Sequence, residues 1–264
     1  MRANSAGLTR DDFVALARTH TVVPVWREVL ADLETPVSAF VKLAGAGADD
    51  PAAFLLESVE HAERWGRFSF LGRDPALTLV ARGRRVEFDR PPPPGVPDDQ
   101  GALAALEALL RAYRAPTIAE LPPFHGGVVG YLGYDVVREI ERLPHVPPDA
   151  LGMPDAVLSV TGHVTAFDHF RQRLYLIENV FLSDDADDAH AANEYDAACT
   201  RLDARVDELA RPLPYTPSPP PPAAGDLAEL PPYTSTMPAA TYHAAVEAAR
   251  EYILAGDIFQ VVLA

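Results

Sequence analysis

The segments LLES (residues 55–58) and RFSFLG (residues 67–72) place three different polar side chains between two apolar runs. The apolar parts are short and bounded by loops containing Gly, Asp or Pro, which predicts two buried strands. A carboxylate (Glu57), a hydroxyl (Ser58) and a guanidinium (Arg67) beside such strands are typical of one wall of a small polar-ligand pocket. The alternative is that all three are solvated ends of strands, because polar residues are mostly exposed.

The rest of the chain predicts further strands, joined in antiparallel fashion, and several helices. Helices are expected at 10–20 (capped by Thr9), 101–113, 191–209 and 241–254, and strands at 36–43, 77–80, 85–88, 126–135 and 156–181, the last as a hairpin turning at 168–171. The glycines of 126–135 suit a strand against which another backbone packs closely. We therefore expect an α+β fold with mainly antiparallel sheets and helices on the outside.

Proline-rich sequence divides the chain. The run RPLPYTPSPPPP (residues 211–222) predicts a semi-rigid connector that cannot lie inside a packed sheet. We expect one domain over 1–211, a linker over 212–238 and the beginning of another domain over 239–264. The last seven residues, 258–264, are apolar and predict a strand, and a natural chain seldom ends within one.

Composition excludes several classes of function. The chain has 264 residues, 48% of them hydrophobic, and a formal charge of −16, which argues against nucleic acid or an anionic membrane surface as the main partner. The single Cys199 allows no intramolecular disulfide, and no apolar run reaches the length of a membrane span or a signal core. We expect a cytoplasmic protein. The eight histidines form no metal-binding signature.

Four blocks, in order, resemble one enzyme family: PVWREVLADLETPVSAFVKL (24–43), LLESVEHAERWGRFSFLGRDP (55–75), GGVVGYLGYDVVREIERLP (126–144) and AGDIFQVVLA (255–264). The family is the large, chorismate-binding subunit of anthranilate synthase (component I). The resemblance implies the N-terminal half of the chorismate-binding fold shared by anthranilate and aminodeoxychorismate synthases, truncated at the point where the catalytic domain begins (239–264). It makes 1–211 a regulatory domain.

The resemblance also implies an activity and its partners. The intact enzyme is a lyase of tryptophan biosynthesis that adds ammonia to chorismate with the help of Mg²⁺ and eliminates pyruvate to give anthranilate. A glutamine amidotransferase (component II) supplies the ammonia. The catalytic histidine and the Mg²⁺ ligands lie in the half that is missing here, so the 264 residues are expected to be inactive alone.

Site residues follow from the same resemblance. Leu56, Glu57 and Ser58 correspond to one wall of the site at which free tryptophan exerts feedback inhibition, and Arg67 adjoins that wall, with a structural ion pair as its favoured role. Gln260 corresponds to a position near the substrate. Related enzymes that add water carry a lysine base there, whereas a neutral amide suits the addition of ammonia. The alternative is that Gln260 is an ordinary polar residue on a half-exposed strand.

Two other functions stay open. One is the large subunit of aminodeoxychorismate synthase in the folate pathway, in which an asparagine more often occupies the position of Val262. The other is a stand-alone module that binds an amino acid.

Overall fold

The computed structural model describes residues 7–44, 52–57, 66–146, 148–213, 219–220 and 234–263. The chain divides into two compact units, Met1–Tyr215 and Thr216–Ala264. The described part of the first unit contains the helices α1 (Arg10–Ala17), α2 (Pro36–Ala44), α3 (Ala102–Ala112) and α4 (Asp188–Leu209) and the 3₁₀ helix η1 (Tyr134–Glu139). Its strands are β1 (Val22–Leu30), β2 (Phe54–Leu56), β3 (Phe68–Arg73), β4 (Leu77–Arg82), β5 (Arg85–Phe88), β6 (Val128–Leu132), β7 (Ala156–Val160), β8 (His163–Asp168) and β9 (Arg173–Phe181).

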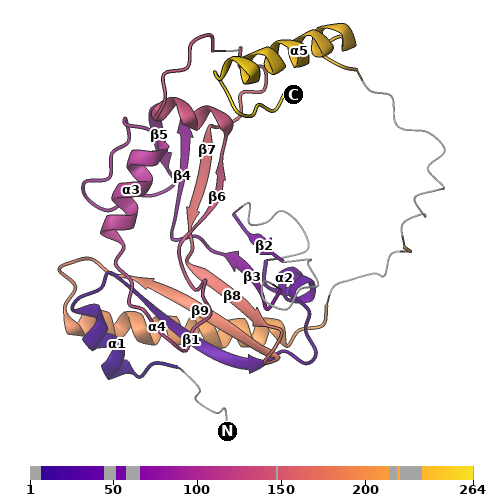
Figure 1. Ribbon diagram of the computed structural model, residues 1–264. Helices are drawn as coiled ribbons and strands as arrows, with labels where there is room; N and C mark the ends of the chain where they lie inside the picture. The colour runs from indigo at the N-terminus through magenta and orange to yellow at the C-terminus, as the bar shows by residue number, and fades with distance from the viewer. Residues whose placement is uncertain are drawn as a thin grey trace. The chain divides into compact units, whose positions relative to one another are not determined.

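One sheet has five strands in the order β1-β9-β8-β3-β2, with antiparallel neighbours throughout. Figure 1 shows α4 running along this sheet, with α1 beside it. Apolar side chains from α1, α2 and α4 pack against one face of the sheet, among them Phe13, Leu43 and Leu202. On the other face, Trp26 and Tyr175 form a smaller cluster with a loop that precedes β6. Both faces of this sheet are therefore covered along its middle strands.

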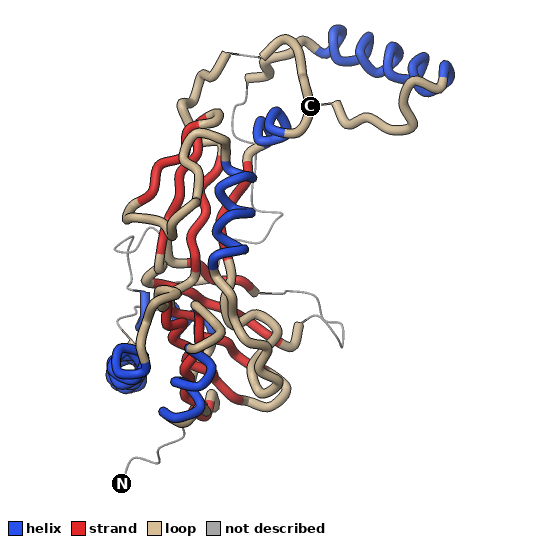
Figure 2. Tube along the Cα trace, turned by 90° about the vertical axis from the view of Figure 1, so that its left-hand side faces the viewer, coloured by secondary structure: helices blue, strands red, loops and turns tan. Residues whose placement is uncertain are grey.

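The second sheet has four antiparallel strands in the order β5-β4-β7-β6 and carries α3. Leu79, Leu109 and Leu158 are buried between this helix and the sheet. The chain passes between the two sheets twice, from β3 to β4 and from β7 to β8 (Figures 1 and 2). The two crossings lie against each other, because a Cβ at Gly162 would stand 2.1 Å from the carbonyl oxygen of Asp74.

The second unit contains α5 (Ala239–Ala255), which ends at Gly256 in the left-handed conformation expected of a C-terminal cap. This helix begins at Ala239, two residues before the predicted helix start, and its N-cap is Pro238. The described residues 257–263 contain no strand, so the strand predicted at 258–264 is wrong over that stretch. No helix in the described ranges is long and apolar enough to cross a membrane.

The predicted α+β architecture with antiparallel sheets is confirmed, and the errors are local. Residues 36–43, predicted as a strand, form α2. The side chains of Thr35 and Ser38 each accept a hydrogen bond from the other's backbone N–H at the start of this helix, at 3.1 and 2.9 Å. Ala39 and Leu43, four residues apart, then bury one face.

The structure differs from the prediction in two further regions, β1 and residues 156–181. β1 includes Pro24, which is tolerated because β1 is an edge strand. The region 156–181 is not one hairpin, because β7 belongs to the four-stranded sheet and only β8 and β9 pair around the predicted turn.

Candidate functional site

The predicted tryptophan wall lies at the open edge of the five-stranded sheet. β2 is the edge strand, and its last residue, Leu56, stands opposite Phe70 of β3. Leu56 and Glu57 are both exposed, and Ser58 lies outside the described residues. Because β2 and β3 are antiparallel, the end of β2 and the start of β3 lie at the same end of the pair. The fold thus brings Glu57 and Arg67 to one corner of the sheet.

Aromatic rings form the surface beside Leu56. Residues two apart on a strand, and residues directly opposite on its partner, share a face, so Phe54, Leu56 and Phe70 project to the same side. Phe124 packs on that side, with ring centroids 5.4 Å from Phe70 and 6.4 Å from Phe54. Phe54 also covers Gly72, where a Cβ would stand 2.2 Å from its ring. The exposed end of β2 therefore rests on a packed aromatic layer.

Arg67 forms an ion pair, and its partner is Asp168 at the end of β8. Its Nε and Nη2 donate to the two carboxylate oxygens at 3.0 and 2.5 Å. Burial acts to raise the pKa of Asp168, but the hydrogen bond from Arg67, backbone N–H donors and the charge of Arg67 outweigh it and hold that pKa below its ordinary value. The carboxyl group of Asp168 is almost fully buried, whereas the Arg67 side chain is 41% exposed.

The same corner is tied by further contacts. Ser69 Oγ lies 2.8 Å from Nε2 of His169, and the backbone N–H of His169 donates to the carbonyl of Arg67 at 2.9 Å. The guanidinium of Arg67 also lies over the rings of Phe68 and Phe170, at 4.7 and 5.7 Å from their centroids. The start of β3 is thereby fixed to the turn between β8 and β9.

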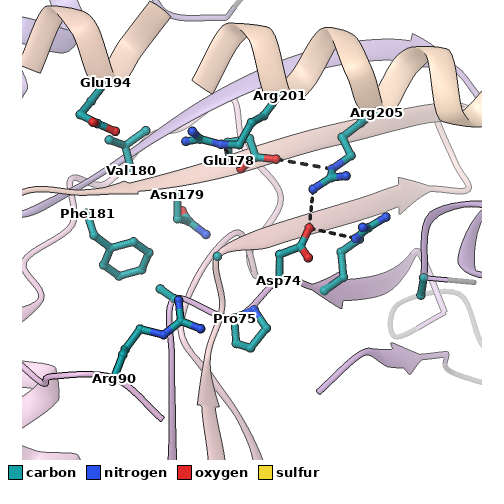
Figure 3. A pocket seen from close by; sticks show the side chains of 14 residues that line it. Asp74, Pro75, Arg90, Glu178, Asn179, Val180, Phe181, Glu194, Arg201 and Arg205 are labelled. Atoms are coloured by element: carbon teal, nitrogen blue, oxygen red, sulfur yellow. Dashed lines mark hydrogen bonds and ion pairs between the residues drawn. The ribbon is translucent and has the colours of Figure 1, made fainter. Parts of the chain in front are cut away.

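A second polar region lies between α4, β9 and the β3–β4 crossing, around a cavity of about 680 Å³. Figure 3 shows Arg201 and Arg205 reaching from α4 toward Glu178 of β9, with Asp74 on the opposite side. Nε of Arg201 donates to Glu178 at 3.2 Å, and Arg205 pairs with Asp74. Arg73 completes the network through Asp74, at 2.9 Å from its Nε.

Glu178 is the buried centre of this network. Its carboxylate accepts from Nδ1 of His163 at 2.9 Å, and Nε2 of that fully buried ring lies 2.8 Å from the hydroxyl of Thr165. Burial acts to raise the pKa of Glu178, but the hydrogen bond from His163 and the charges of His163, Arg201 and Arg205 outweigh it and lower that pKa. Glu178 is therefore held as a carboxylate within the fold.

Neither polar region offers a set of metal ligands. In the ranges that the structure describes, no three His, Cys, Asp or Glu side chains are grouped so as to hold a metal ion. The carboxylates that lie near one another, Asp74, Glu178 and Glu208, are engaged by arginines. These residues do not fit a Mg²⁺ site.

Gln260 belongs to the second unit, in the segment that follows α5. Its side chain is exposed, and it lies in no helix or strand. The half-exposed strand of the alternative interpretation is absent at this position.

Sequence reasoning did not anticipate the partners that organise both regions. Asp168 was expected only as a turn residue, and 101 residues separate it from Arg67. Glu178, Arg201 and Arg205 carried no motif at all. Pairs so distant in the chain could be found only from the strand pairing that brings them together.

Comparison with known proteins identifies the kind of chain to which these regions belong. Residues 52–264 match the family model described as chorismate binding enzyme. The chain is 41% identical to "Anthranilate synthase component 1" of Mycolicibacterium smegmatis, over 80% of this chain and 40% of that protein. The protein of the same name from Mycobacterium tuberculosis is 38% identical, over 99% of this chain and 50% of its own length. The chain thus spans about half the length of the curated relatives that it matches.

A solved structure has the same fold. The crystal structure of anthranilate synthase component I from Streptococcus pneumoniae matches with a TM-score of 0.50 and 22% sequence identity. The match covers 87% of this chain and 46% of that chain.

Proposed function

The chain belongs to the chorismate-binding enzymes, and we propose that it is the N-terminal part of an anthranilate synthase component 1. The complete lyase converts chorismate and ammonia to anthranilate and pyruvate, in the cytoplasm and for tryptophan biosynthesis. The observation that carries this proposal is the 38% identity over 99% of the chain to a relative of that name. The four sequence blocks between 24 and 264 occur in the family's order, which agrees with this proposal.

We assign to this half the control of the enzyme by free tryptophan. A zwitterionic amino acid needs an anion or carbonyl groups for its ammonium and donors for its carboxylate. Glu57, exposed at the end of β2, supplies an anion, and Ser58 supplies a hydroxyl. Leu56 and the layer of Phe54, Phe70 and Phe124 supply an apolar surface on which an indole can rest.

Arg67 acts as a positioning residue in this account. Two of its nitrogen atoms are already committed to Asp168, so the pair holds the start of β3 against the β8–β9 turn. The end of β2 is paired to β3 and is positioned through it. Tryptophan inhibits by favouring one of two arrangements of the enzyme, and linkage requires that chorismate weaken tryptophan binding in return.

The remaining parts of the reaction are assigned as follows. Gln260 lies near chorismate. Its neutral amide cannot deprotonate water, so water is not activated there and ammonia is the nucleophile that adds. Mg²⁺, which would assist that addition, is held by residues outside these 264. Ammonia comes from a glutamine amidotransferase, component II.

The experiment uses a hybrid chain in which residues 1–264 replace the matching half of the Mycobacterium tuberculosis relative. We expect anthranilate fluorescence from the hybrid with chorismate, Mg²⁺ and ammonium salt, inhibition of that activity by tryptophan, and no product from residues 1–264 alone. Formation of aminodeoxychorismate, or activity that tryptophan does not affect, would contradict the proposal. Calorimetry with tryptophan on residues 1–264 tests the stand-alone module, for which we expect little or no binding.

A further inference from the structure

The cavity beside Glu178 lies where the two sheets of the first unit meet. Both chain segments that cross between the sheets line it, through residues 74–76 in one and Gly162 in the other. β9 and α4 line it from the five-stranded sheet, and the loop after β5 contributes Arg90. Its volume of about 680 Å³ lies within the range of roughly 300–1,000 Å³ that is usual for small-molecule sites. A ligand held here would contact parts of both sheets.

Two of the arginines that line the cavity have N–H groups to spare. Arg201 donates its Nε to Glu178 at 3.2 Å, and neither of its terminal nitrogens has a hydrogen-bond partner among the described residues. Arg90 donates Nε and Nη2 to one oxygen of Asp89, at 3.1 and 2.9 Å, and its Nη1 has no partner in the same ranges. Figure 3 shows these two guanidinium groups on facing sides of the cavity. They are therefore donors that a bound anion can use.

Charge limits the kind of anion that fits. Four arginines and three acidic residues line the cavity, which leaves an excess of one positive charge. The other two arginines, Arg73 and Arg205, are both engaged by Asp74. Glu194 also lines the cavity, and like Glu178 it would repel a second negative charge. A monoanion therefore suits the cavity better than a dianion such as phosphate.

Apolar side chains supply the rest of the lining. Pro75 and Phe181 lie on either side of the space between the two arginines (Figure 3), and Val180 lines the cavity beside Phe181. The ring of Phe181 is fixed by an edge-on contact with Tyr113, at 5.0 Å between the ring centroids. The apolar surface is therefore formed before any ligand binds, which lowers the entropy cost of binding.

We propose that this cavity is a binding site for a small monocarboxylate with an apolar body, separate from the tryptophan wall at β2. Arg90 and Arg201 donate to the carboxylate, because guanidinium groups pair well with planar carboxylates. Pro75 and Phe181 contact the apolar body. Since Arg201 belongs to the helix on one sheet and Arg90 follows a strand of the other, the ligand stabilises one arrangement of the two sheets. The proposal does not depend on the proposed function.

Calorimetry on residues 1–264 with sodium benzoate tests the proposal. We expect saturable one-to-one binding, which Arg90→Gln weakens about tenfold by removing a charged donor. Arg90 is 54% exposed and pairs only with its neighbour Asp89 among the described residues, so this variant should keep the melting temperature of the natural chain. Arg111→Gln, which breaks an exposed pair on α3, is the matched control and should bind benzoate normally. Absence of saturable binding by the natural chain, or equal binding by the two variants, would overturn the proposal.

Two further probes establish the class of ligand. Inorganic phosphate and L-phenylalanine should both bind more weakly than benzoate, the first because it carries a second negative charge and lacks an apolar body. Glu194→Gln should strengthen benzoate binding about twofold, because it removes a like charge from the cavity. Phosphate that binds as tightly as benzoate would identify a general anion site and overturn the proposal. Tighter binding of L-phenylalanine, weakened by Glu194→Gln, would identify a site for zwitterions and overturn it as well.

Discussion

Arg67 and Asp168 are joined by two parallel hydrogen bonds, at 3.0 and 2.5 Å, although 101 residues separate them in the chain. This pair connects the start of β3 to the end of β8, at the corner where Leu56 and Glu57 are presented to solvent. Two side chains that were candidates for ligand binding therefore differ in what they can do. Glu57 is exposed, whereas Arg67 already neutralises a buried carboxylate.

Replacing Arg67 tests its role in positioning the corner. Arg67→Ala leaves the buried Asp168 without its guanidinium, and we expect the melting temperature of residues 1–264 to fall by roughly 5 °C. In the hybrid chain the variant should raise the tryptophan concentration needed for inhibition several-fold. Asp168→Asn should have the same two effects, because either change breaks the pair.

Arg85→Ala is the matched control for this test. Arg85 pairs with Glu87 on the exposed strand β5, so its loss should change neither quantity. A normal tryptophan response in Arg67→Ala and Asp168→Asn, despite lowered melting temperatures, would show that the pair stabilises the fold without positioning the tryptophan wall.

The Glu178 network should contribute strongly to stability. Glu178→Gln removes the buried charge that faces His163, Arg201 and Arg205, and we expect a loss of about 2 kcal/mol in the free energy of unfolding. Urea unfolding followed by circular dichroism measures it. Glu107→Gln, which breaks an exposed pair on α3, should cause no measurable change. Equal effects of the two substitutions would contradict the central place of Glu178.

Stability should fall in acid for a reason that can be traced to two groups. The pKa values of Asp168 and Glu178 are both lower in the folded chain than their ordinary values. The unfolded chain therefore takes up these protons first, so the stabilisation is complete above about pH 5 and is lost as the pH falls through about 4 and below. Urea midpoints between pH 7 and pH 3 should decline less steeply for Glu178→Gln than for the natural chain.

The fold class could be predicted because local patterns agree with it. Short stretches of sequence are enough to predict the helix caps at Thr9 and Gly256 and the β4–β5 hairpin. Residues 36–43 were misassigned because Val, Phe and Leu suit a strand, and the exchange of hydrogen bonds between Thr35 and Ser38 outweighs that preference.

The sites could be predicted only in part. The LLES motif could be recognised from the sequence because its residues are adjacent in the chain and so remain neighbours in the fold, where they lie at the exposed end of β2. Asp168, Glu178 and Arg205 could not be located, since their importance comes from partners in other strands or in α4. The order of strands in a sheet depends on pairing between distant segments, so no single segment predicts it.

Gly130 tests the packing of the four-stranded sheet. A Cβ at this position would stand 1.9 Å from the carbonyl oxygen of Val157, so Gly130→Ala should cost about 3 kcal/mol or prevent folding. Gly95→Ala is the comparison, because Gly95 has a positive φ and open space around it, and only about 1 kcal/mol is expected there. Similar losses in urea unfolding would contradict the close contact between β6 and β7.

The central claim is that the end of β2 forms part of a tryptophan site that controls a synthase. The most direct measurement is inhibition of anthranilate formation by tryptophan in the hybrid chain, with and without Ser58→Arg. We predict that the substitution leaves turnover largely intact and raises the half-inhibitory tryptophan concentration at least tenfold. The long, charged arginine side chain would occupy the space beside this wall that tryptophan needs. An unchanged half-inhibitory concentration, with turnover intact, would contradict the account.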